Sequence, residues 1–240
     1  NEIPGLKSVN AVDDSGVHPL LLAIGSERYT PYNPTRVPQE ILTIANHILG
    51  TGQLSLAKYL FIIEEENAPD INDKEAFFKH LFERVNWSRD LHFQTKTTMD
   101  TLDYSGEGLN EGSKVIIAAA GIKKRSLLSI KPTLDLPNHF NHSFMVCDGV
   151  LSIDGNGDIN ILIEYLEKIN LKGISLITVV DDANFVSEDF SNWLWVCFTR
   201  SNPSHDIFGL HSKMINKHFS CSIPIIDARI KAHHAPVLKR

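Results

Sequence analysis

The sequence predicts an α/β protein built from two related Rossmann-like units with mostly parallel sheets. Three observations lead to this class. Short apolar runs typical of buried strands alternate with segments of helical periodicity. A motif recurs in the two halves of the chain. The 240 residues are 42% hydrophobic and 22% charged, an ordinary globular composition that allows a substantial core.

In the first half, buried strands are predicted at residues 18–25, 59–63 and 115–120, and a strand or extended loop at 91–104. Pro38 predicts the start of a helix, because its missing N–H is harmless there, and Gly50 predicts its end. A second helix is expected after Asn72, the predicted N-cap, with Glu75 as its capping-box partner.

In the second half, residues 131–143 contain two prolines, two asparagines and two histidines, which is typical of a linker. A helix is predicted around residues 162–169 and a β-branched strand at 174–180. Ser187 is expected to cap a helix, and Pro224 indicates that a last short strand lies at a sheet edge. The predicted organisation is a first unit at 1–130, a linker at 131–143 and a second unit at 144–240.

The repeat consists of a buried strand, an acidic pair, a helix and the motif Arg-x-Asn-x-Ser-x-Asp. Its residues are Glu64, Glu65, Arg84 and Asp90 in the first copy, and Asp181, Asp182, Arg200 and Asp206 in the second. Each arginine is expected to reach back from the end of its helix to a carboxylate. A structural ion pair is the favoured interpretation. A ligand site is the alternative, because open α/β sheets bind ligands beyond the carboxyl ends of their strands.

Composition disfavours several functions. The formal net charge of −6, without a basic block, argues against nucleic acid as a partner. No apolar run reaches the ~20 residues that a membrane-spanning helix needs. Cys147, Cys197 and Cys221 lack the spacing of a disulfide framework, so buried free thiols and a cytoplasmic location are expected.

Other candidate motifs are weak. Residues 106–114 contain Gly-Ser-Lys, but a phosphate-binding loop needs Gly-Lys-Ser/Thr, so a turn is expected. His233 and His234 are adjacent and would diverge on a regular element, so a metal site is not expected and their role stays open. Asp227 and Arg229 are expected to form structural ion pairs.

The two copies resemble the C-terminal domain of UbiD-type decarboxylases, which are 3-octaprenyl-4-hydroxybenzoate carboxy-lyase-like enzymes. The second copy carries the resemblance in residues 179–182, Trp193, Trp195, 199–200 and Asp206. The first carries it in its acidic pair, in Arg84 and Asp90, in residues 99–105 (Met-Asp-Thr-Leu-Asp-Tyr-Ser) and in 112–114. The common family form has one such domain, so this chain looks like a variant with a second copy.

The resemblance implies a parent enzyme that decarboxylates aromatic or α,β-unsaturated acids non-oxidatively, for example in quinone biosynthesis. It also implies prenylated FMN, a divalent metal and a monovalent cation in an N-terminal domain, where the catalytic residues lie. No catalytic, cofactor-binding or metal-binding residue is therefore expected in this chain. The start at Asn1, without Met, suits a fragment or a processed chain. Because the cofactor domain is missing, the chain alone is expected to be inactive. The expected partners are the N-terminal flavin domain and further copies in a homo-oligomer. The alternative is a stand-alone oligomerising or ligand-binding module.

Overall fold

The computed structural model describes residues 2–16, 18–28, 36–106 and 108–234. The first unit contains β1 (Leu6–Ala11), η1 (Asp13–Ser15), β2 (Leu20–Gly25), α1 (Glu40–Leu49), η2 (Gly52–Leu56), β3 (Tyr59–Glu64), α2 (Lys74–Arg84), β4 (Leu91–Thr98) and β5 (Glu111–Ala119), where η denotes a 3₁₀ helix. The strands predicted around residues 18–25, 59–63 and 115–120 are β2, β3 and β5, and the extended segment from residue 91 is β4.

The second unit begins with strand β6. Its elements are β6 (Phe140–Cys147), β7 (Val150–Gly155), α3 (Ile159–Leu166), β8 (Leu176–Val180), α4 (Ala183–Glu188), α5 (Phe190–Arg200), α6 (Pro203–Asp206), β9 (Ile207–Leu210), β10 (Lys213–Ile215), β11 (His218–Ser220) and β12 (Ile223–Asp227). The first four residues of β6 fall in the segment predicted to be a linker. Asn141 and His142 are exposed there, so this edge strand lacks the apolar run that would have indicated it.

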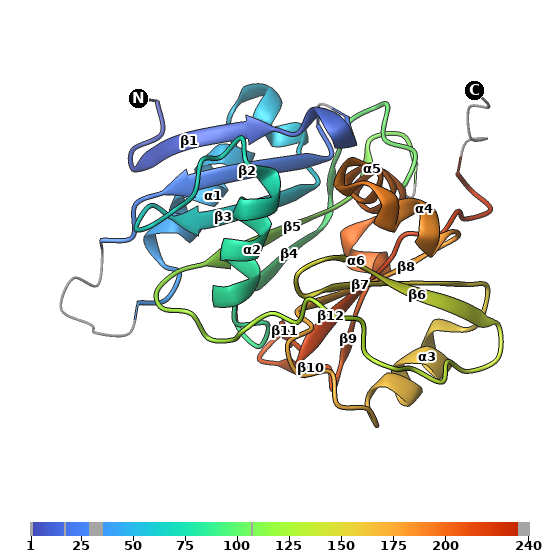
Figure 1. Cartoon of the computed structure of the whole chain (residues 1–240). Helices are drawn as coiled ribbons and strands as arrows, with labels where there is room; N and C mark the ends of the chain where they lie inside the picture. Colours follow the sequence, from blue (N-terminus) through green and yellow to red (C-terminus); the bar gives the residue numbers. More distant parts are fainter. Residues whose placement is uncertain (1, 17, 29–35, 107, 235–240) are drawn as a thin grey trace.

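The two five-stranded sheets share one topology (Figure 1). Their strand orders are β1-β2-β3-β5-β4 and β6-β7-β8-β12-β9. In each sheet the three central strands run parallel, and the strand at either edge is antiparallel to its neighbour. Each sheet is therefore mixed, and the predicted pair of related α/β units is confirmed.

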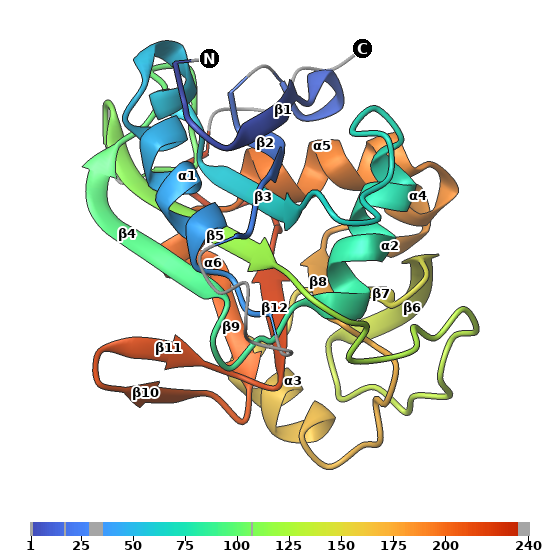
Figure 2. The ribbon, with the colours of Figure 1, turned by 90° about the vertical axis from the view of Figure 1, so that its left-hand side faces the viewer.

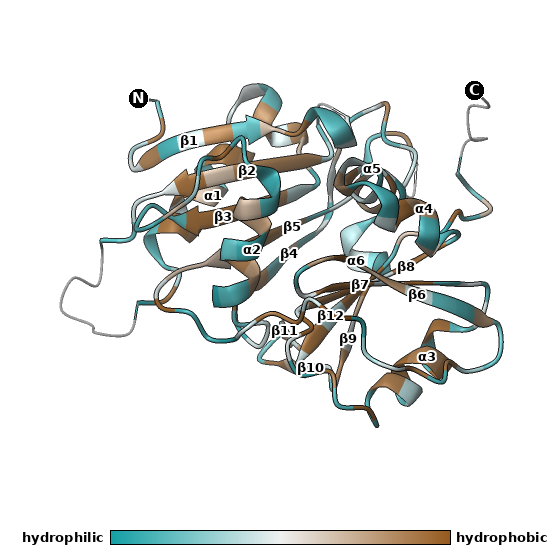
Figure 3. Ribbon diagram, in the orientation of Figure 1, coloured by the Kyte–Doolittle hydropathy of each residue, from teal (hydrophilic) through white to brown (hydrophobic). Residues whose placement is uncertain are grey.

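Helices cover both faces of each sheet. Helix α1 packs on the outer face of the first sheet and α3 on the outer face of the second. The inner faces of both sheets, together with α2, α4 and α5, form one shared hydrophobic core. Figure 3 shows the apolar colouring along strands β3 and β12 and on α3. The two units are thus joined by burial of apolar surface, the main stabilising contribution in folding.

Aromatic rings occupy the centre of the shared core. Phe198 of α5 lies edge-on to Tyr59 and Phe61 of β3, with ring centroids 4.9 and 5.6 Å apart. Phe78 of α2 meets Trp193 of α5 at 5.4 Å. Edge-to-face geometry of this kind adds to the energy of area burial. Rings from each unit therefore fill space against the other.

The connection between the last two strands of each sheet crosses to the other unit. In the first unit, residues 99–110 join β4 to β5, and the hydroxyl of Tyr104 lies 3.5 Å from that of Thr199 on α5. In the second, residues 211–222 join β9 to β12 and contain the hairpin β10–β11, which contacts β4 (Figure 2). At the base of the first connection, fully buried Lys58 is paired with Asp103 at 2.8 Å.

Three local expectations are wrong. The N-cap of α2 is Asp73, whose carboxylate accepts from Ala76 N, and not the neighbouring Asn72. The N-cap of α5 is Asp189, because Ser187 lies within α4. Strand β12 is internal and not at an edge. It tolerates Pro224 because pairing with β8 begins only at Ile225, so the missing N–H breaks no bond to that strand.

Candidate functional site at the carboxyl ends of the central strands

Each sheet has a point where the chain leaves adjacent parallel strands toward opposite faces. Strand β2 leads to α1 on the outer face and β3 to α2 on the inner face. Strands β7 and β8 repeat this, leading to α3 and α4 respectively. Ligands in open α/β sheets bind in the crevice at such a switch point. The predicted acidic pairs lie there, directly after β3 and β8.

In the first unit the protein's own side chains occupy this corner. Glu64 is 4% exposed, is paired with Arg36, and accepts from Gly121 N at 2.8 Å. Glu65 is more exposed and is paired with Lys7 at 3.1 Å. The corner carboxylate is therefore satisfied within the fold.

Arg84 does not reach the first acidic pair, so this expectation is wrong for the first copy. Its guanidinium donates to the carbonyl of His80 at 3.0 Å and to Glu83 at 3.2 Å, both on its own helix. Arg36 pairs with Glu64 in its place. The spacing of the repeat cannot reveal this, because Arg36 comes from a segment that the motif does not include.

In the second unit the expected contact is present. Arg200 Nη1 lies 3.0 Å from Asp181 Oδ2, which also accepts from Ile230 N at 2.9 Å. Asp182 is the N-cap of α4 and accepts from Phe185 N at 3.0 Å. Both carboxylates thus have structural partners, although the Asp181 side chain is 43% exposed.

The last residue of the motif has the same role in both copies. Asp90 accepts from Asn86 N at 2.8 Å, and Asp206 accepts from Asn202 N at 2.6 Å. Both aspartates are buried, and burial raises the pKa of each. The repeated Asn-x-Ser-x-Asp spacing therefore encodes a turn that a buried carboxylate closes.

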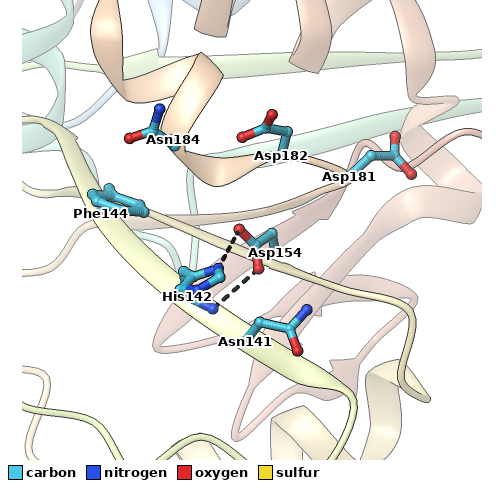
Figure 4. A pocket seen from close by; sticks show the side chains of 7 residues that line it. All are labelled: Asn141, His142, Phe144, Asp154, Asp181, Asp182 and Asn184. Carbon is cyan, nitrogen blue, oxygen red and sulfur yellow. Dashed lines mark hydrogen bonds and ion pairs between the residues drawn. The ribbon is translucent and has the colours of Figure 1, made fainter.

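An open hollow of about 510 Å³ lies at the second corner (Figure 4). Its lining comes from β6, from the ends of β7 and β8 and from the start of α4: Asn141, His142, Phe144, Asp154, Asp181, Asp182 and Asn184. Asp154 accepts from His142 N at 3.0 Å and from Ala183 N at 3.3 Å. Of these residues the sequence had indicated only the acidic pair. Asp154 could have been found as the acidic residue before Gly155 at the end of an apolar run.

The hollow offers carboxylate and amide groups, an imidazole and one aromatic face. Such a set can hydrogen-bond a small polar or cationic molecule. Across the described ranges, no three His, Cys, Asp or Glu side chains gather closely enough to hold a metal ion. The donor set therefore fits a polar ligand better than a metal.

The remaining candidate residues have structural surroundings. Lys114 donates to the carbonyl of Ala57 at 3.0 Å, and burial lowers its pKa to about 8. His234 packs against Tyr104 and His233, and burial lowers its pKa to about 4. The expected ion pair between Asp227 and Arg229 is present at 2.6 Å. Glu107 and residues 235–240 lie outside the described ranges.

All three cysteines are free thiols, as predicted. Cys197 and Cys221 are buried and Cys147 is partly buried. Burial raises the pKa of Cys147 and of Cys221 to about 12, and it raises the pKa of Cys197 as well. None of them is therefore an activated nucleophile.

The fold and this corner define a pair of α/β units with a switch-point hollow in the second. Residues 1–119 match the family described as the 3-octaprenyl-4-hydroxybenzoate carboxy-lyase C-terminal domain. The first unit therefore belongs to this family, and the predicted resemblance is confirmed. The second unit lies outside the matched residues, and it is related to the first by its sheet topology and the shared motif.

Two relatives from Chlamydia match nearly the whole chain. A protein of Chlamydia pneumoniae that is named as a subunit of 4-hydroxybenzoate decarboxylase is 31% identical over 238 residues, which is 95% of this chain and 38% of the relative. An uncharacterized protein of Chlamydia trachomatis is 31% identical over 224 residues, covering 93% of this chain and 37% of the relative. The chain thus spans less than two fifths of the length of these relatives.

Solved structures with some similarity include vanillic acid decarboxylase of Sedimentibacter hydroxybenzoicus. The match with its closed form covers 56% of this chain and 26% of the decarboxylase chain, with 20% identity and a TM-score of 0.42. A UbiD-class enzyme of Pelotomaculum thermopropionicum, solved in complex with FMN, matches 50% of this chain and 24% of its own, with 16% identity and a TM-score of 0.40. No helix in the described part of the chain has the length and apolar character needed to span a bilayer.

Proposed function

We propose that this chain is the supporting and assembly part of a decarboxylase that uses prenylated FMN, and that it does not decarboxylate by itself. The observation that carries the proposal is the family match of the first unit. It is supported by the relative named as a subunit of a decarboxylase, which aligns with both units. The proposed substrates are aromatic or α,β-unsaturated acids, with quinone biosynthesis as one setting. The proposed location is the cytoplasm.

The contacts within the chain support an architectural role. Each corner carboxylate has an internal partner: Arg36 for Glu64 and Arg200 for Asp181. The shared core makes the two units one body, which suits a platform for a flavin domain and for further copies. In this proposal the flavin domain of the same protein supplies the cofactor, the metal ions and the catalytic groups.

The test compares the full-length protein with this chain alone. Both are incubated with prenylated FMN, a divalent metal ion, potassium and 4-hydroxybenzoate, and CO₂ release is measured. Mass by light scattering gives the oligomeric state of each. We expect turnover and a homo-oligomer for the full-length protein and no turnover for the chain. Turnover by the chain alone would refute the supporting role.

The hollow at the second corner favours one alternative, a module that binds a small polar ligand. Its test is a thermal-shift screen of polar metabolites with the wild type and with Asp154→Asn, which keeps the size of the side chain but removes its charge. A ligand that stabilises the wild type and not the variant would favour this alternative. The control variant is Asp73→Asn, which makes the same change at a carboxylate of the first unit that does not line the hollow.

A further inference from the structure

The hairpin β10–β11 connects the second unit to the edge strand of the first. It forms its own two-stranded sheet, so its contact with β4 depends mainly on side chains. Phe219 of β11 lies edge-on to Phe93 of β4, with ring centroids 5.7 Å apart. The neighbouring pair, His218 and His92, has centroids 5.3 Å apart. Figure 2 shows the hairpin projecting from the body of the protein beside β4.

The two histidines carry an unusual feature. The Nε2 atoms of both His92 and His218 are buried, and neither has a hydrogen-bond partner among the described residues. A neutral ring can leave one nitrogen unpaired at a moderate cost. A protonated ring would place a charged N–H donor there without an acceptor, which costs more.

The charged surroundings oppose protonation as well. The titratable and charged groups acting on His92 are His218 on β11 and Arg89 in the turn before β4, and Arg89 is paired with Asp90 at 2.7 Å. Burial, then His218, then Arg89 lower the pKa of His92 to about 4. Its neighbour on β5 is the apolar Ile116. A metal ion between the rings would meet the same positive charge.

We propose that His92 and His218 form an acid-sensitive clasp: protonation in mild acid releases the hairpin β10–β11 from strand β4. The proton comes from solvent, and no covalent bond changes. Release exposes the free edge of β4 and loosens one of the two crossings between the units. The shared core remains closed, because the clasp lies at its margin.

The direction follows from linkage. In the released state His92 has its ordinary pKa of about 6.5, so the released state binds more protons than the closed state. Release is therefore favoured as the pH falls from about 6.5 toward 4. At pH 5 we expect the opening equilibrium to rise on the order of 10-fold over its value at pH 7.5.

Hydrogen exchange measured by mass spectrometry tests the clasp. Peptides covering residues 91–98 and 211–222 are compared at pH 7.5 and 5.0, after correction for the intrinsic rates. We expect the opening equilibrium of these peptides to rise on the order of 10-fold at pH 5.0, and that of peptides from β7 and β8 to stay unchanged. Equal protection of the clasp peptides at both pH values would overturn the proposal.

The double variant His92→Phe/His218→Phe keeps aromatic rings at the contact and removes both imidazoles. It should lose the pH effect, whereas the control His47→Phe, at an exposed position of α1, should retain it. An undiminished pH effect in the double variant would also overturn the proposal. Should the double variant not fold, an NMR titration of wild-type His92 decides instead: a pKa well below 6.5 supports the clasp, and an ordinary value refutes it.

Discussion

The carboxyl ends of β3 and β8 occupy equivalent places in two sheets of the same topology, yet their acidic residues have different surroundings. Glu64 is buried beneath Arg36 and Gly121. Asp181 is half exposed and borders an open hollow. The difference arises in the segments that pass over the strand ends, since neither Arg36 nor Gly121 belongs to the repeated motif. Duplication thus reproduces the framework and leaves the corner to be determined by the connecting segments.

The first prediction concerns what the two units share. Phe198 belongs to the second unit but packs on Tyr59 and Phe61 of the first. Phe198→Ala should lower the free energy of unfolding by about 3–5 kcal/mol, because it leaves a cavity in the shared core. Denaturant unfolding should show a single transition shifted as a whole. The control Phe185→Ala, at a 43% exposed position, should change stability by less than about 0.5 kcal/mol. Two separate transitions would show that the units fold independently.

The second prediction compares the corners directly. Glu64→Ala removes a buried acceptor from Arg36 and from Gly121 N, so we expect a loss of about 2–3 kcal/mol. Asp181→Ala removes a half-exposed pair with Arg200 and should cost less than about 1 kcal/mol. Chemical denaturation of both variants in one buffer measures the difference. Equal losses would mean that the corners are energetically alike despite their different exposure.

The third prediction concerns pH. His80 of α2 lies four residues before Arg84. The equivalent position in the second copy, four residues before Arg200, is Val196. Burial, more than the nearby Arg84, lowers the pKa of His80 to about 4. The neutral ring is therefore favoured in the fold, and the stability it contributes is lost as the pH falls from about 6.5 toward 4. His80→Val should reduce the loss of stability between pH 7.5 and 5 by about 1–2 kcal/mol. Unfolding curves at the two pH values provide the measurement, and unchanged pH dependence would contradict it.

Much of the fold could be predicted because its signals are local. Strands β2, β3 and β8 are apolar runs buried on both faces, as parallel strands require. Strand β6 was missed because it is a half-exposed edge with polar residues at its start. Pro224 indicated an edge strand because proline lacks the N–H that a neighbouring strand would need. Strand β12 is internal, and Pro224 is tolerated because pairing with β8 begins only at Ile225, while Pro224 itself pairs with β9.

The candidate site could be predicted only in part. The acidic pairs stand out because they follow strands directly, and the contact from Arg200 to Asp181 follows from a helix that returns to the strand end. Arg36 and His142 could not be found in this way, since each comes from an element outside the repeat. Such partners are far apart in the sequence and meet only in the folded structure, so the spacing of a motif cannot predict them.

The sequence by itself determined the α/β class, the internal repeat and the family to which the first unit belongs. Periodicity, turn residues and a recurring motif are properties of short segments, so they can be read without knowing how the segments pack. Only the tertiary structure decided that the two units share one core, that each sends a connection across to the other, and that a lined hollow opens at the second corner. Those features depend on which apolar faces bury each other and on which distant side chains then meet, and both are decided when the sheets pack together.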